Sequence, residues 1–141
     1  MTTISPVNSI AAGALNAARV RLEASASNTV NARSGGAAPG AAAETGPPDR
    51  ARTTFRPVAA NQASLANGGV RVDLRMVQPG YFMAYAPSSP DADKDGMTAM
   101  PDVDPAAEAV NRIQARRQYE ANLRVIETAG QMQGAALKID L

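Results

Sequence analysis

Residues 104–137, DPAAEAVNRIQARRQYEANLRVIETAGQMQGAAL, decide the fold class of this chain. Asp104 and Pro105 predict a helix start, because aspartate caps free amide groups and proline at the first helical position has no amide to leave unpaired. Apolar residues then recur at steps of three, four or seven, with one phase slip between Ile113 and Tyr119. The stretch therefore predicts one long helix that ends at about Leu137 and packs its apolar stripe against another helix.

The N-terminal region predicts that second helix. Ser5 and Pro6 repeat the cap-and-proline signal, and apolar residues recur at three- and four-residue steps from Val7 to Ala26. On the long helix, oppositely charged pairs at four-residue spacing favour a solvated outer surface, namely Glu108 with Arg112, Arg116 with Glu120, and Glu120 with Arg124. We expect the two apolar stripes to form an assembly seam, made of Val7, Ile10, Ala14, Leu22, Val110, Ile113, Tyr119, Leu123, Ile126 and Leu137.

Between the helices, the period of the pattern changes to that of β-strands. In Val70–Met76 apolar and charged residues alternate, which predicts a strand with one face on a core and the other in water. A turn at residues 67–69, Asn-Gly-Gly, joins this strand to a hairpin partner around Thr53–Val58, and Tyr81–Tyr85 is a third strand. Residues 33–48 are rich in glycine and proline and predict a flexible loop.

Together these patterns predict a mainly α fold. Paired N- and C-terminal helices form a coiled-coil-like domain, and a small β-hairpin element is inserted between them. The expected segments are an N-terminal helix at 1–32, a flexible loop at 33–49, the β element at 50–88, an Asp/Pro/Gly loop at 89–104 and the C-terminal helix at 105–141.

Composition excludes several classes of function. The 141 residues include 14 basic and 13 acidic side chains, so the net charge of +1 encodes no broad attraction to nucleic acid. Cysteine and histidine are both absent, which removes thiol nucleophiles, the commonest zinc ligands and the usual general base, so an enzyme is not expected. The N-terminus has no basic region before its apolar residues, and we expect neither a cleaved signal peptide nor a membrane span.

The acidic run at residues 90–102, PDADKDGMTAMPD, has nearly the spacing of an EF-hand calcium loop. An EF-hand needs a helix on each side, whereas Pro87 precedes the run and both Pro90 and Pro101 lie within it. The alternatives are therefore a calcium sensor and a solvated aspartate–glycine turn, and the prolines favour the turn. No metal or cofactor is predicted.

Two regions resemble a known family. Residues 26–32, ASNTVNA, look like the ANNIANA signature of flagellar axial proteins. GVRV at 69–72, DADKDG at 91–96 and the residues from Pro101 to Ile126 resemble the proximal-rod proteins of the flagellar basal body. The residues that carry the family signature are Asn28, Asn31, Ala121 and Asn122. Departures such as Ser89 and Asp102 are compatible with a standard rod subunit and with a divergent paralogue.

The resemblance implies a structural subunit of the periplasmic rod of the bacterial flagellum. Such a subunit is exported by the flagellar type III apparatus, polymerises with itself and other rod proteins through its terminal helices, and transmits torque across the periplasm. It also implies that the acidic run connects the β element to the last helix and has no calcium role. The alternative hypothesis is a coiled-coil adaptor that acts outside the flagellum.

Overall fold

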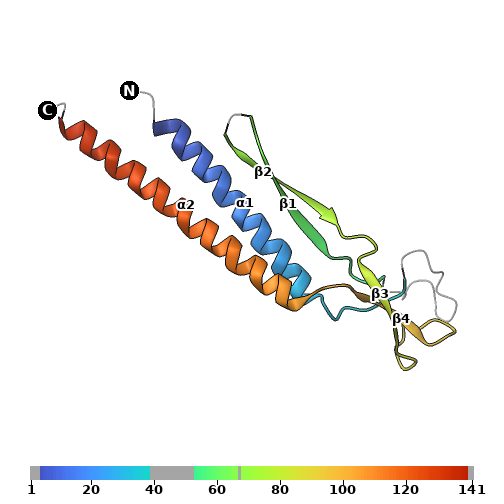
Figure 1. Cartoon of the computed structure of the whole chain (residues 1–141). Coiled ribbons are helices and arrows are strands. Elements are labelled where there is room, and N and C mark those ends of the chain that lie inside the picture. Colours follow the sequence, from blue (N-terminus) through green and yellow to red (C-terminus); the bar gives the residue numbers. More distant parts are fainter. Residues whose placement is uncertain (1–3, 39–52, 67, 140–141) are drawn as a thin grey trace. The chain divides into compact units, whose positions relative to one another are not determined.

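The protein consists of two terminal helices with a β region between them, as a computed structural model shows (Figure 1). The structure describes residues 4–38, 53–66 and 68–139. The elements in chain order are α1 (Ile4–Val30), β1 (Val58–Ser64), β2 (Val70–Met76), β3 (Tyr81–Tyr85), β4 (Met97–Pro101) and α2 (Pro105–Ile139). The predicted order of helix, β element and long helix is confirmed, although two small sheets make the fold more mixed than "mainly α".

The residues fall into two compact units. A helical unit comprises Met1–Ala24, Ala60–Leu74 and Ala109–Leu141, and a junction unit comprises Ser25–Ala59 and Arg75–Glu108. Each helix therefore contributes residues to both units.

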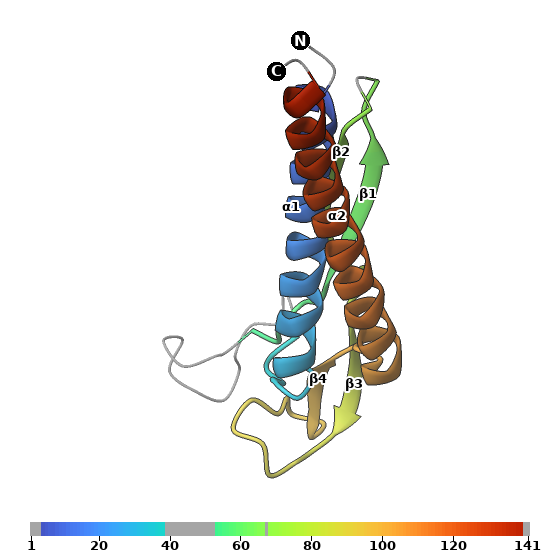
Figure 2. The same ribbon diagram turned by 90° about the vertical axis from the view of Figure 1, so that its left-hand side faces the viewer.

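In the helical unit, α1 and α2 lie side by side and antiparallel (Figures 1 and 2). Arg21 Nη1 donates a hydrogen bond to Gln118 Oε1 at 3.0 Å, which links the two helices. Among the residues of this unit that the structure describes, the buried apolar side chains are all alanines: Ala11, Ala14, Ala17, Ala18, Ala24, Ala115 and Ala129. Methyl side chains let helices approach closely, but none of the large side chains in the described residues is fully buried.

The ends of the helices are close to those predicted. Asp104 Oδ1 accepts hydrogen bonds from the amides of Ala106 (2.8 Å) and Ala107 (3.3 Å), which confirms the predicted cap of α2. The helix continues to Ile139, two residues beyond the predicted end. The predicted start of α1 at Ser5 is slightly wrong, since the helix begins at Ile4 and Pro6 lies in its first turn, where proline removes no helical hydrogen bond.

Strands β1 and β2 form a hairpin. The Leu65 amide donates to the Gly69 carbonyl at 2.8 Å, and Gly68 has a φ of 83°, so the predicted glycine turn is confirmed. The predicted partner range, Thr53–Val58, is wrong because the strand starts only after Pro57, which has no amide for a ladder. The apolar face of β2 is also less covered than predicted, with Leu74 and Met76 both exposed.

Strands β3 and β4 form an antiparallel pair in which Tyr81 lies opposite Pro101 and Tyr85 opposite Met97. The prediction that residues 89–104 form only a loop is wrong, because β4 lies within them. Ala99 in β4 is completely buried and exchanges two 3.0 Å backbone hydrogen bonds with Gly36. Gly36 thus belongs to this packed region rather than to a free loop. The rest of the predicted flexible loop, from residue 39, lies outside the described residues.

The first part of the acidic run, residues 90–96, lies in the β3–β4 connection. Asp93 Oδ1 accepts hydrogen bonds from the amides of Asp95 (2.9 Å) and Met97 (2.8 Å). Gly96 has a φ of 74°, which a side chain would disfavour. These bonds are those of an aspartate–glycine turn, because an aspartate carboxylate bonds readily to amides just after it in the chain.

Candidate assembly surface

Asn28, near the end of α1, holds three segments of the junction unit together. Its Nδ2 donates to the Val58 carbonyl at 2.9 Å and to Glu108 Oε1 at 2.7 Å, and its Oδ1 accepts from the Val58 amide at 3.0 Å. One turn earlier, Ser25 Oγ donates to the Glu108 carbonyl at 2.9 Å. Only 2% of Asn28 is exposed, so water does not compete for these bonds. We call Ser25, Asn28, Val58 and Glu108 the Asn28 junction.

The chemistry of the junction requires a carboxamide. Its oxygen can accept from the amide of Val58, while its two N–H groups can donate to a backbone carbonyl and to a carboxylate. Hydrogen bonds to an ionised group are stronger than neutral ones. An aspartate at position 28 would have no donor for either acceptor, and alanine would leave all three groups without their partner. This geometry gives the first asparagine of the signature a structural role.

The other signature residues make local contacts. Asn31 Nδ2 donates to the Ser27 carbonyl at 2.9 Å, and its Oδ1 accepts a 3.3 Å bond from Ser34 Oγ. Asn122 Nδ2 donates to the Gln118 carbonyl at 2.7 Å, one turn earlier in α2. Ala121 is exposed. The structure therefore does not bring the four predicted signature residues together in one site.

On α1, the predicted seam divides into a buried and an exposed part. Ala14 is buried, whereas Val7, Ile10 and Leu22 are exposed despite their size. The side chains that α1 buries most completely are alanines and, near its end, Ser25 and Asn28.

On α2, the large residues of the seam are largely uncovered. Ile113 is 53% exposed and Leu123 45%, while Ile126 is half-buried. Val110, Tyr119 and Leu137 are also exposed. Ile113 lies only two residues before the buried Ala115, about 200° around the helix. The two residues therefore face opposite sides of α2.

Sequence reasoning included Ala11, Ala14 and Ala18 in the apolar stripe of the N-terminal helix, but it missed the other buried alanines and some residues that α2 exposes. Apart from Ala14, none of the seven buried alanines was among the predicted seam residues. Val125 and Met132 are exposed and apolar and were also missed. The signal that could have identified the others is their heptad spacing, because Ala17 and Ala24 are seven residues apart and Ala115 and Ala129 are fourteen.

The arrangement favours binding of another protein surface over chemistry. The described residues contain no group of three acidic, histidine or cysteine side chains that could hold a metal ion. Nor does any described helix combine the length and apolarity needed to cross a membrane. Instead, exposed apolar side chains lie along most of the length of α2. Arg116 and Glu120, a pair expected from the sequence, form an ion pair of 2.8 Å among them. Surfaces with many exposed apolar side chains commonly mark interaction sites.

Comparison with known proteins identifies relatives over most of the chain. Residues 94–139 match the family described as "Flagellar basal body rod FlgEFG protein C-terminal". The flagellar basal-body rod protein FlgC of Yersinia enterocolitica is 40% identical over 120 residues, which cover 84% of each chain. The FlgC proteins of Escherichia coli O6:H1 and Salmonella typhimurium are 38% and 37% identical over 124 residues, or 87% of each chain. These relatives are rod components by name and not enzymes.

Proposed function

The chain belongs to the FlgC family of flagellar basal-body rod proteins, and on that premise we propose that its helices pair as a coiled coil and join the rod through their exposed apolar faces. As a member of this family the protein is a structural subunit of the rod in the flagellar basal body. Between the two hypotheses from the sequence, this relationship favours the rod subunit over the adaptor.

The observation that carries the proposal is the difference in size between buried and exposed apolar residues. Alanines occupy the buried positions of the helical unit, while Ile113, Leu123 and Leu137 remain exposed. Full burial of one such large side chain contributes about 1.5–3 kcal/mol, whereas an alanine methyl contributes far less. Most of the available hydrophobic stabilisation therefore becomes accessible only when another surface covers α2.

The small apolar core is also compatible with two further roles that we propose from the resemblance, export through the type III apparatus and torque transmission. A chain that buries only small side chains needs little free energy to unfold, which is compatible with export as an unfolded polypeptide by the flagellar type III apparatus. Polymerisation through helix faces would also allow the assembled rod to transmit torque, since many subunits would share each load.

Leu123→Asp tests the proposal. Because Leu123 is already exposed in the free chain, the new carboxylate should leave the monomer intact, but in the rod it would have to be desolvated without a partner. We expect loss of motility and at least about a tenfold drop in subunits recovered in purified basal bodies, with unchanged secretion. Adding Ile126→Asp should complete the loss.

Thr128→Asp is the matched control, since it adds the same charge to an exposed position on a different side of α2. It should assemble normally. Full motility of the Leu123→Asp variant would contradict the proposal, because this face of α2 would then remain in water in the rod.

A further inference from the structure

Strand β3 has one paired edge and one open edge. Bonds from Asp102 N to Gly80 O (3.0 Å) and from Ala86 N to Gly96 O (2.8 Å) bracket its pairing with β4. Backbone groups alternate in direction along an antiparallel pair. The N–H and C=O groups of Phe82 and Ala84 therefore face β4, and those of Tyr81, Met83 and Tyr85 face away. Among the described residues, no backbone hydrogen bond reaches these outward groups.

Nothing in the sequence of β3 protects this edge. Native proteins commonly block open edges with charged residues, prolines or bulges, but the strand reads YFMAY. Phe82 and Met83, on opposite faces of the strand, are both exposed, and Tyr85 is 74% exposed. An apolar edge strand with free donors and acceptors is a site for the addition of another strand.

Strand β2 also has an open backbone edge, which could pair with that of β3. Bonds from Leu65 N to Gly69 O and from Val77 N to Pro57 O bracket the β1–β2 hairpin in the same way, so the backbone groups of Val72, Leu74 and Met76 face away from β1. At Val58, the outer edge of β1 is occupied by Asn28. The outer edge of β1 is thus partly occupied, and the more open edge of this hairpin is that of β2, where Leu74 and Met76 are exposed.

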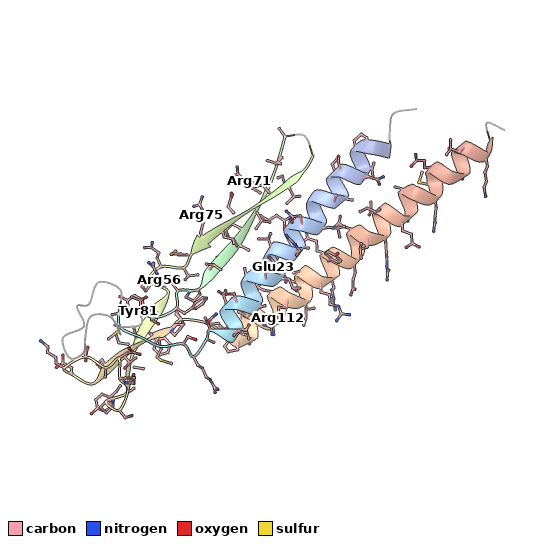
Figure 3. All side chains as sticks on the ribbon, turned by 180° about the vertical axis from the view of Figure 1, so that it is seen from behind. Glu23, Arg56, Arg71, Arg75, Tyr81 and Arg112 are labelled. Atoms are coloured by element: carbon pink, nitrogen blue, oxygen red, sulfur yellow. The ribbon has the colours of Figure 1, made fainter. Side chains whose placement is uncertain are left out.

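The loop after β3 and strand β2 also carry opposite charges. The loop that follows Tyr85 carries Asp91, Asp93 and Asp95 against the single Lys94. Arg71 and Arg75 project from β2 (Figure 3). Arg71 forms a 2.8 Å ion pair with Asp73 of the same strand, whereas Arg75 has no ion pair among the described residues and leaves β2 with a net positive charge. Opposite charges on two surfaces favour the right pairing and disfavour contact between like surfaces.

We propose that the open edge of β3 pairs with the edge of β2 from a second copy of this chain in the rod. This inference rests on the proposed function, since it names one contact through which rod subunits join. The contact joins two different surfaces, so each copy keeps one free edge of each kind. Such a heterologous contact continues from subunit to subunit instead of closing a dimer.

A proline substitution tests the edge of β3. Met83→Pro removes an outward amide but no hydrogen bond to β4, a position where an edge strand tolerates proline. Losing one interstrand bond and the fit around it should reduce recovery in purified basal bodies about tenfold. Met83→Ala, which keeps the amide, should assemble normally. Equal recovery of the two variants would overturn the proposal.

Disulfide trapping tests the partner strand independently of how Met83→Pro folds. The chain has no native cysteine, so Met83→Cys can be combined in turn with Val72→Cys, Leu74→Cys or Met76→Cys. Paired strands place facing Cα atoms about 4.5–5.5 Å apart, within disulfide range. Oxidised rods should contain disulfide-linked multimers for at least one pair, and none for the β2 single variants.

Two results would contradict the proposal. Rods that contain every variant but no linked multimers would exclude the β2–β3 contact while leaving the role as a rod subunit intact. Dimers from Met83→Cys alone would show that two β3 edges meet. Absence of the wild-type chain from rods would instead refute the proposed function.

Discussion

The Asn28 junction and the helical unit bury different kinds of residues. In the junction, one buried carboxamide satisfies both backbone groups of Val58 and the Glu108 carboxylate, all within the chain. Among the described residues of the helical unit, only alanines are buried, and Leu123 remains exposed. A buried polar group must find its partners inside the chain, because leaving it unpaired costs free energy. An apolar side chain can remain exposed until a partner covers it. We infer that the Asn28 junction mainly stabilises the fold of the single chain, whereas the exposed apolar residues of the helices mainly serve assembly.

The largest effect should come from breaking the junction. Asn28→Ala removes the partner of both Val58 backbone groups and one hydrogen bond to the Glu108 carboxylate, and we expect it to lower the free energy of unfolding by about 3 kcal/mol. Asn31→Ala is the control, since Asn31 makes only local bonds; it should cost about 0.5 kcal/mol. Urea unfolding followed by circular dichroism measures both. Equal losses of unfolding free energy in the two variants would mean that the long-range bonds of Asn28 stabilise the chain no more than the local bonds of Asn31.

A smaller effect should come from overfilling the alanine contact in the helical unit. Ala18 is 1% exposed, so Ala18→Leu must push neighbouring groups apart, and overpacking costs about 1–3 kcal/mol. Ala12→Leu is the matched control, because Ala12 is exposed on the same helix. Thermal unfolding should show a lower midpoint for Ala18→Leu alone. If both variants were equally stable, the space around Ala18 would be larger than the structure indicates.

The smallest effect should come from the start of α2, which is held by one side chain near the junction. Asp104→Ala removes the acceptor for the amides of Ala106 and Ala107 and should cost about 1 kcal/mol. Asp104→Asn should retain most of the stability, because asparagine also caps helices well. The same urea titration measures both, and an unchanged midpoint for Asp104→Ala would show that the first turn of α2 needs no cap.

The sequence predicted most of the fold because its signals are local. Asp104-Pro105 marks the start of α2, and the alternation in Val70–Met76 marks β2, without knowledge of distant contacts. Strand β4 was missed because Met97–Pro101 follows an aspartate-rich turn and ends in proline, both of which are typical of loops. What makes this segment a strand is its pairing with β3 and Gly36, which a local pattern does not contain.

The candidate site was less predictable because its contacts join residues that lie far apart in the sequence. Asn28 was identified as a signature residue, but its partners lie 30 and 80 positions away in the chain. The seam was predicted from large apolar residues, whereas the side chains that the two helices bury in the single chain are mainly alanines. Burial of the seam residues in the rod stays a prediction. Exposure of Ile113 and burial of Ala115 cannot both follow from hydrophobicity, since isoleucine is the more apolar residue.

Amide hydrogen exchange, measured side by side on the free monomer and the assembled rod, tests whether the helical unit needs a partner to become stable. We predict weak protection of residues 7–26 and 106–137 in the monomer, because helices with little buried apolar surface are marginally stable in water, and strong protection of the same residues in the rod. The Val58 amide, held by Asn28, should be the better protected site in the monomer. Strong protection of both helices in a verified monomer would contradict the account, because the helical unit would then be complete without a partner.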